Sequence, residues 1–228
     1  MQTFLQSRAG LGIAAVLAAI FCQGAAAQDA PAKDAPIREA TGIPPRTAPA
    51  EYQSHAQAGL VTVAAEFTRH SVATLQATLI TEDYVVVEVG FFGPSGTRVK
   101  VSHEDFSLRI NGKRFPLQAQ PYGLVFSSLK DPEWVPPVTE GSKSKTGITG
   151  GGGGENDPGA TPTVPKMPFE LVRVMQQRVQ KAALPEGERL LPVAGLIFFE
   201  YRGKPTSIKS IDLTYDGPAG KAVVQLRP

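Results

Sequence analysis

The sequence predicts an all-β protein, a β-sandwich of about eight strands with one inserted helix. Short segments alternate apolar and polar residues and are separated by turn residues, which is typical of half-buried strands. After the amino terminus, only one segment has apolar residues at helical spacing, so the pattern does not fit a parallel α/β fold. The 20 prolines and 23 glycines also favour a chain rich in turns and loops.

Residues 1–27 are predicted to be an export signal. Arg8 supplies the positive region, an uncharged apolar stretch ends at Phe21, and Ala25-Ala26-Ala27 predicts cleavage between Ala27 and Gln28. We therefore expect a periplasmic or secreted protein with no stable membrane insertion after cleavage. An uncleaved anchor is one alternative, although the apolar stretch is short for it. A lipid-modified Cys22 is the other, although Phe21 does not suit the position before it.

The predicted mature chain contains no thiol, because Cys22 is the only cysteine of the sequence. Thiol catalysis, disulfide bonds and cysteine zinc sites are then excluded together. The net charge falls from +2 to near +1, since Arg8 is the one charged residue of the signal. This balance gives no electrostatic reason to expect nucleic acid or an anionic membrane as partner.

Residues 28–58, rich in Ala and Pro, predict a disordered tether, and a single domain is expected over 59–228. Alternating apolar and polar residues over 61–68 and 73–79, and the mostly apolar segment 84–92, predict its first strands.

Asn111-Gly112 predicts a type I′ turn between strands 106–110 and 113–117, because both central residues of that turn need positive φ. Pro116 cannot donate a backbone hydrogen bond, so the second strand of this hairpin is expected at a sheet edge.

A long irregular loop follows, with a flexible low-complexity insertion over about 138–167 that contains five glycines at 150–154. Residues 168–183 then predict a helix, whose apolar stripe includes Val172, Met175 and Val179. We expect this stripe to dock on the sandwich; contact with a partner helix or a second copy is the alternative. Three further strands are predicted over 195–201, 208–215 and 222–226.

The most natural topology for these strands is an immunoglobulin-like β-sandwich. The 105–117 hairpin, the Leu184-Pro185-Glu186-Gly187-Glu188 step and the apolar strand 195–201 resemble exported bacterial immunoglobulin-like domains of unassigned function. The resemblance covers roughly residues 60–118 and 184–227. It implies a fold and an export route, and it carries over no active residues.

Motifs with catalytic chemistry are short and incomplete. Ser127-Ser128-Leu129-Lys130 followed by Lys145-Thr146-Gly147 has two of the three elements of penicillin-binding serine enzymes, with Ser127 as nucleophile and Lys130 as base. Pro132 limits any helix there, and the third element, S-D-N, is absent from the sequence. His55, His70 and His103 are expected to be solvated turn or tether residues, so we predict no metal and no cofactor.

Trp134, the only tryptophan, lies in an irregular stretch near Tyr122 and Phe126. Aromatic anchors on such segments are frequent contact residues, although the three could also form a lid on the sandwich. We therefore expect a non-catalytic exported module that contacts an unknown protein at the cell envelope. The alternatives are the serine enzyme and a periplasmic protein that binds a ligand or glycan.

Overall fold

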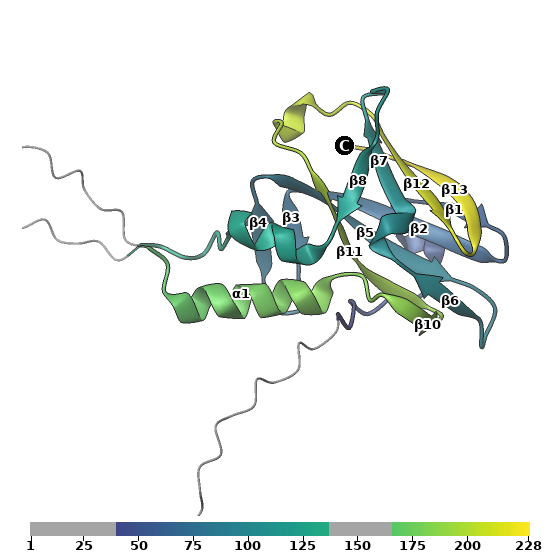
Figure 1. The fold of residues 1–228 in the computed structure, drawn as a ribbon, viewed down its shortest axis with the longest axis horizontal. Helices are drawn as coiled ribbons and strands as arrows, with labels where there is room; N and C mark the ends of the chain where they lie inside the picture. The colour runs from purple at the N-terminus through teal and green to yellow at the C-terminus, as the bar shows by residue number, and fades with distance from the viewer. Residues whose placement is uncertain (1–39, 137–165) are drawn as a thin grey trace, which may run out of the picture. The chain divides into compact units, whose positions relative to one another are not determined.

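The computed structural model describes residues 40–136 and 166–228. The chain divides into two units; Met1–Ile37 lies outside the described residues, and the structure below concerns the other unit, Arg38–Pro228. Its main element is one antiparallel sheet of eight strands, ordered β1-β2-β5-β11-β8-β7-β12-β13 (Figure 1). The strands are β1 (Ser54–Ala58), β2 (Val61–Arg69), β5 (Tyr84–Phe92), β11 (Val193–Glu200), β8 (Leu117–Gln120), β7 (Phe106–Ile110), β12 (Ile211–Gly217) and β13 (Gly220–Leu226).

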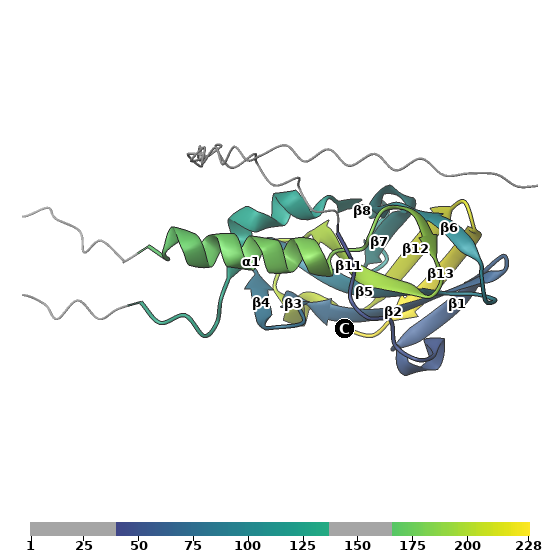
Figure 2. The ribbon, with the colours of Figure 1, turned by 90° about the horizontal axis from the view of Figure 1, so that it is seen from below.

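The two edge strands of this sheet, β1 and β13, approach each other, so the sheet is nearly closed into a barrel (Figure 2). At one end, Gln53 Nε2 donates to the carbonyl of Arg227 at 2.9 Å. At the other end, a Cβ added to Gly59 would lie only 2.5 Å from the carbonyl oxygen of Ala219. The predicted immunoglobulin-like sandwich is therefore wrong, because one curled sheet replaces two facing sheets.

The difference between a sandwich and this barrel rests on a very short strand pairing. Among the described strands, the one pairing that joins the halves β1-β2-β5-β11 and β8-β7-β12-β13 is that of Phe198 and Phe199 in β11 with Gln120 and Ala119 in β8. Alternation along each strand reports which side is buried, and it is the same for two facing sheets and for one curled sheet. The sequence pattern was therefore unable to distinguish the two folds.

The barrel interior is a closed apolar core built from the inward residues of nearly every strand. Phe106 of β7, Tyr215 of β12 and Phe91 of β5 are all fully buried. Their rings meet at centroid distances of 5.1 to 5.9 Å. Edge-to-face and tilted ring contacts of this kind stabilise a core beyond the area they bury.

A second core lies on the outer face of β5 and β11. The helix α1 (Phe169–Ala182) packs there and confirms the predicted helix (Figure 1). Its buried residues Met175 and Val179 contact outward residues of the sheet, among them Val86 and Phe198. Both strands are thus buried on both faces, which explains their near-continuous apolar sequence.

Two small sheets complete the described strands. One has the order β3-β4-β9, with β3 (Ser71–Ala73), β4 (Thr78–Thr81) and β9 (Leu129–Lys130); the other pairs β10 (Gly187–Leu190) with β6 (Arg98–Val101). The predicted strand 73–79 is wrong, because residues 74–77 form the turn between β3 and β4. The Thr74 backbone N–H and hydroxyl both donate to the Ala77 carbonyl, at 3.0 and 2.6 Å. Threonine favours such local turns, and this preference overrides the alternating pattern.

The Asn111-Gly112 turn forms with the predicted backbone, since φ is 53° at Asn111 and 64° at Gly112. Its second strand begins later than predicted, at Leu117, which pairs with Leu108. The edge prediction from Pro116 is also wrong, because β8 lies between β11 and β7. Pro116 precedes the strand and therefore removes no hydrogen bond from it.

The described chain begins inside the predicted tether, and its first residues are ordered against the barrel. Residues 40–53, which we call the strap, lead through the 3₁₀ helix η1 (Pro49–Glu51) into β1. The Ile43 N–H donates to the Ala194 carbonyl of β11 at 3.0 Å. Composition was unable to predict this, because the strap is held by contacts with strands that are distant in the sequence, such as β11.

One arginine of the strap joins two strands of the barrel. Arg46 Nη2 lies 3.1 Å from Glu88 of β5 and 2.5 Å from Glu66 of β2. Glu66 and Glu88 are direct cross-strand partners, a placement that is unfavourable for two carboxylates alone. The Arg46 guanidinium also lies 4.4 Å from the ring centre of Tyr52.

Candidate functional site

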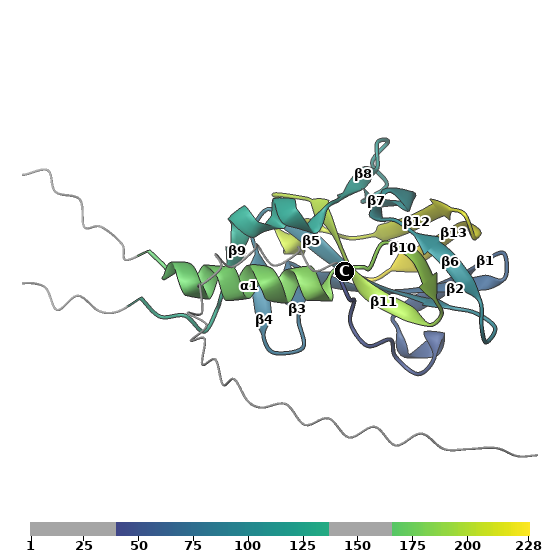
Figure 3. The same ribbon diagram turned by 60° about the horizontal axis from the view of Figure 1, so that its bottom comes forward.

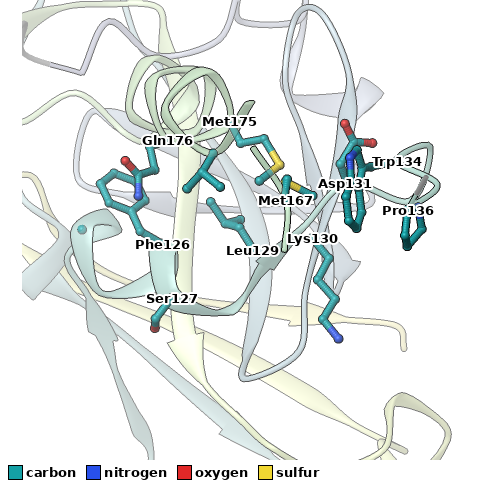
Figure 4. A pocket seen from close by; sticks show the side chains of 12 residues that line it. Phe126, Ser127, Leu129, Lys130, Asp131, Trp134, Pro136, Met167, Met175 and Gln176 are labelled. Carbon is teal, nitrogen blue, oxygen red and sulfur yellow. The ribbon is translucent and has the colours of Figure 1, made fainter. Parts of the chain in front are cut away.

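A groove of about 950 Å³ opens between α1 and residues 122–136 (Figure 4). The 3₁₀ helix η3 (Tyr122–Ser128) with β9 lines one side of the groove, the 131–136 segment lines the side opposite η3, and α1 lines a third side. Two of the three methionines of the chain, Met167 and Met175, line the groove together with its only tryptophan, Trp134. Unbranched, polarisable methionines are typical of apolar surfaces that adapt to a partner.

The apolar stripe of α1 loses its cover towards the start of the helix. Val179 is fully buried and Met175 is 2% exposed, Val172 is half-buried, and Phe169 is 74% exposed. Phe169 precedes Val172 by three residues and Gln176 by seven, so it lies over these two groove-lining residues, at the edge of the stripe and not at its centre. Figure 3 shows the reason: the first turns of α1 extend past β3 and β4.

A short turn places Trp134 in the groove wall. The Trp134 N–H donates to the Asp131 carbonyl at 3.2 Å, and the Glu133 N–H donates to the Asp131 carboxylate at 2.9 Å. An aspartate that accepts from the residue two positions later stabilises a tight turn without secondary structure. Trp134 is half-buried, and its neighbour Val135 is 75% exposed.

The three aromatic residues singled out from the sequence separate into two groups. Phe126 and Trp134 line the groove from opposite sides, with Leu129 and Met175 between them (Figure 4). Tyr122 does not line it; its ring packs on Phe126 at 5.9 Å, and both pack against the second core. The lid interpretation therefore describes Tyr122 and Phe126, whereas Trp134 lies at the groove beyond that core.

The η3 side of the groove is held in place by a buried pair of hydroxyls. Thr81 Oγ1 at the end of β4 and Ser128 Oγ at the end of η3 are hydrogen-bonded at 2.7 Å. Ser128 Oγ also lies within donating distance of the Val125 carbonyl, at 3.0 Å. Both residues are at most 7% exposed, so these bonds fix η3 to β4 in a water-poor setting.

Ser127 and Lys130 also line the groove, but each is engaged elsewhere. The Ser127 hydroxyl donates to the Leu124 carbonyl at 3.4 Å, and Lys130 Nζ lies 2.5 Å from Glu82. Ser127 is the penultimate residue of the 3₁₀ helix η3 while Lys130 lies on β9, so the two do not share the helical turn that the serine–lysine chemistry requires. Figure 4 shows their side chains well separated.

The histidines lie on three different elements. His55 lies on β1, His70 in the turn after β2, and His103 opens the 3₁₀ helix η2 (His103–Asp105), where its Nδ1 pairs with Glu186. Within residues 40–136 and 166–228, no group of three or more potential metal ligands comes together.

Tyrosines and one aspartate have altered acidity away from the groove. Burial raises the pKa of Tyr215, whose hydroxyl accepts from the Ala219 N–H. Burial also raises the pKa of Asp105 in η2 and of Tyr52 in the strap. These titratable groups belong to the barrel and the strap, so they supply no chemistry to the groove.

The last 3₁₀ helix, η4 (Pro205–Ser207), lies before β12.

Several predicted features lie outside the described residues. They are the cleavage site at Ala27 and Gln28, Cys22, the Lys145-Thr146-Gly147 motif and the glycines at 150–154. Within the described part of the chain, none of the helices has the length and apolar character needed to span a bilayer.

Comparison with known proteins gave no relative from which a function could be transferred. No protein-family model, no curated protein and no solved structure matches this chain. The function must therefore be argued from the groove itself.

Proposed function

We propose that this protein is an exported, non-catalytic module that contacts another protein chain at the cell envelope through the groove between α1 and residues 122–136. The observation that carries this proposal is the exposed end of the α1 stripe. An apolar side chain as large as Phe169, 74% exposed beside an apolar groove, leaves a surface that a protein partner would cover favourably.

The composition of the groove supports contact over chemistry. Trp134, Phe126 and the methionines Met167 and Met175 offer large apolar surfaces, and tryptophan is among the residues most often responsible for binding energy. The polar groups Ser127 and Lys130 are engaged by Leu124 and Glu82. We expect a fluorescent penicillin to leave Ser127 unlabelled, and covalent labelling there would instead support the serine enzyme.

Binding of a small ligand or glycan is the second candidate, and the size of the groove favours it. Its volume of about 950 Å³ lies within the range of small-molecule sites, roughly 300 to 1,000 Å³. Titration with envelope glycans or fatty acids, followed by Trp134 fluorescence, separates this candidate from protein contact. A saturable change would support a ligand site, and an unchanged spectrum would argue against one.

A pair of matched positions allows a direct test in cells that export the protein. Phe169 and Phe115 are 74% and 77% exposed, and Phe115 lies on the β7–β8 hairpin. A photoreactive benzoylphenylalanine is placed at one position or the other, and cross-linked adducts are compared after irradiation. The proposal predicts discrete protein adducts from position 169 and none from position 115. The same adducts from both positions, or none from either, would contradict it.

A further inference from the structure

We propose that the partner at the groove is a second copy of this chain, and that Phe169 of each copy enters the groove of the other. This inference rests on the proposed function, because it names the occupant of the same contact surface. Phe169 is a large apolar residue that is exposed on the first turn of a helix, and the fold of a single copy gives no reason for this exposure. The inference supplies one.

The first argument is that the exposed side chain of Phe169 and the groove belong to the same part of the surface. Phe169 is 74% exposed on the first turn of α1 and precedes by three residues Val172, which lines the groove together with Met175 and Trp134. In a dimer with two-fold symmetry, the same patch is used by both copies, so it must contain both a projecting group and a site that receives it. A surface that binds a different protein needs either a projecting side chain or a receiving groove, but not both.

The second argument is the charge around the patch. Lys130 and Asp131 line the groove, and the charged residues next to its lining residues in the sequence or on the first helical turn are Glu133, Lys166, Glu170 and Arg173. Glu82, which pairs with Lys130, makes the total three basic and four acidic residues. A surface that meets its own copy brings like charges together unless the signs are mixed, because each charge is present twice. This patch is close to balanced, so a second copy is not repelled.

The third argument is that two sides of the groove, η3 and α1, are fixed before a second copy arrives. The buried Thr81–Ser128 hydrogen bond anchors η3, and the fully buried Val179 anchors α1. These two sides are therefore already formed in each copy, and less conformational entropy is lost on association than if they had first to order.

Sedimentation of the exported chain over a wide range of concentrations tests the inference. We expect a concentration-dependent dimer whose dissociation constant rises about 30-fold or more in Phe169→Glu, since a charged side chain replaces a central apolar contact. Phe115→Glu is the matched control, and it should leave the dissociation constant unchanged. Both residues are largely exposed, so both variants should keep the circular dichroism spectrum of the original protein.

Cross-linking with isotope-labelled copies identifies the occupant. Equal amounts of ¹⁴N and ¹⁵N chains that carry benzoylphenylalanine at position 169 are mixed and irradiated. The inference predicts adducts of mixed isotope between position 169 and groove residues such as Trp134. Adducts of one isotope only, for example with residues 137–165, would show that the chain fills its own groove, and they would overturn the inference.

Two further outcomes also overturn the inference, and they separate its failure from that of the proposed function. A monomer at all concentrations with position 169 cross-linked to another envelope protein would exclude a second copy and retain the proposed contact role. A dimer that Phe169→Glu does not weaken would place the interface elsewhere on the molecule. A monomer without any adduct at position 169 would remove both proposals.

Discussion

The inner and outer faces of the same two strands, β5 and β11, differ in how they are covered. The inner face closes on itself, because the sheet curls and residues such as Val87 and Phe199 are fully buried. The outer face depends on α1 for cover, and the helix extends past the surface on which it packs. Burial therefore falls from Val179 through Val172 to Phe169 towards the start of the helix. The comparison teaches that most of the buried core belongs to the barrel, while the surface that we propose for contact lies at the uncovered end of the helix.

The largest effect is expected inside the barrel. Phe106→Ala removes a fully buried ring that contacts Phe91 and Tyr215, and it should lower the free energy of unfolding by about 3 to 5 kcal/mol. Urea denaturation followed by circular dichroism measures this loss. A loss below about 1.5 kcal/mol would mean that the inner face is not the main source of stability.

A smaller loss is expected where the strap crosses the outer face. Arg46→Ala leaves the carboxylates of Glu66 and Glu88 facing each other without a cation, which should lower the free energy of unfolding. The expected loss is about 1 to 2 kcal/mol and no larger, because the Arg46 side chain is only partly buried. Adding Glu66→Gln to this variant should restore part of the stability, since one of the two facing charges disappears. Lys221→Ala breaks an exposed pair with Asp216 and serves as the control, with a loss of about 0.5 kcal/mol or less. Equal losses in Arg46→Ala and Lys221→Ala would show that the strap pair is no stronger than a surface pair.

A pH-dependent effect is expected at the end of the barrel. Burial raises the pKa of Asp105 above its ordinary value of 3.8, and the carboxylates of Glu104 and Asp216 raise it further. The folded protein then binds this proton more tightly than the unfolded chain does. The contribution of Asp105 to stability is present below the pKa of this residue in the unfolded chain, and it is lost as the pH rises through its pKa in the folded protein.

Asp105→Asn removes this titration. The variant should gain stability relative to the original protein as the pH rises from the acid range towards neutrality. Urea denaturation at a series of pH values measures the difference between the two proteins. A difference that shrinks with rising pH would show that Asp105 is stabilised in its charged form.

The smallest effect on stability is expected at the uncovered end of α1. Phe169→Glu should change the free energy of unfolding of the monomer by no more than about 0.5 kcal/mol, because the ring is 74% exposed. Measurement at a protein concentration too low for association isolates this value. A large loss would mean that Phe169 packs within its own chain and is not available to a partner.

The elements of the fold could be predicted where local pattern and burial agree. Strands β2 and β5 and the helix α1 follow from their apolar spacing, and Asn111 and Gly112 adopt the positive φ that their turn requires. The fold class could not be predicted, because closure of the barrel depends on the pairing of Phe198 and Phe199 with β8. No local pattern in the sequence reports that pairing.

The candidate site was predictable only in part. Trp134 and Phe126 could be singled out as aromatic residues on an irregular segment, and both line the groove. Met167 and Phe169 were not singled out, although the helical spacing of Phe169 with Val172 was visible. Their importance depends on how far α1 extends past β3 and β4, and this is a property of the folded chain.

The central claim, that the groove is covered by another chain, is tested most directly by the accessibility of Trp134. Because this is the only tryptophan of the sequence, its fluorescence and its quenching by iodide report on the groove alone. Our account predicts that quenching of the exported chain falls and emission shifts to shorter wavelength as the protein concentration rises, and that Phe169→Glu abolishes both changes. Quenching that is equally strong at all concentrations, in the original protein and in the variant alike, would contradict it.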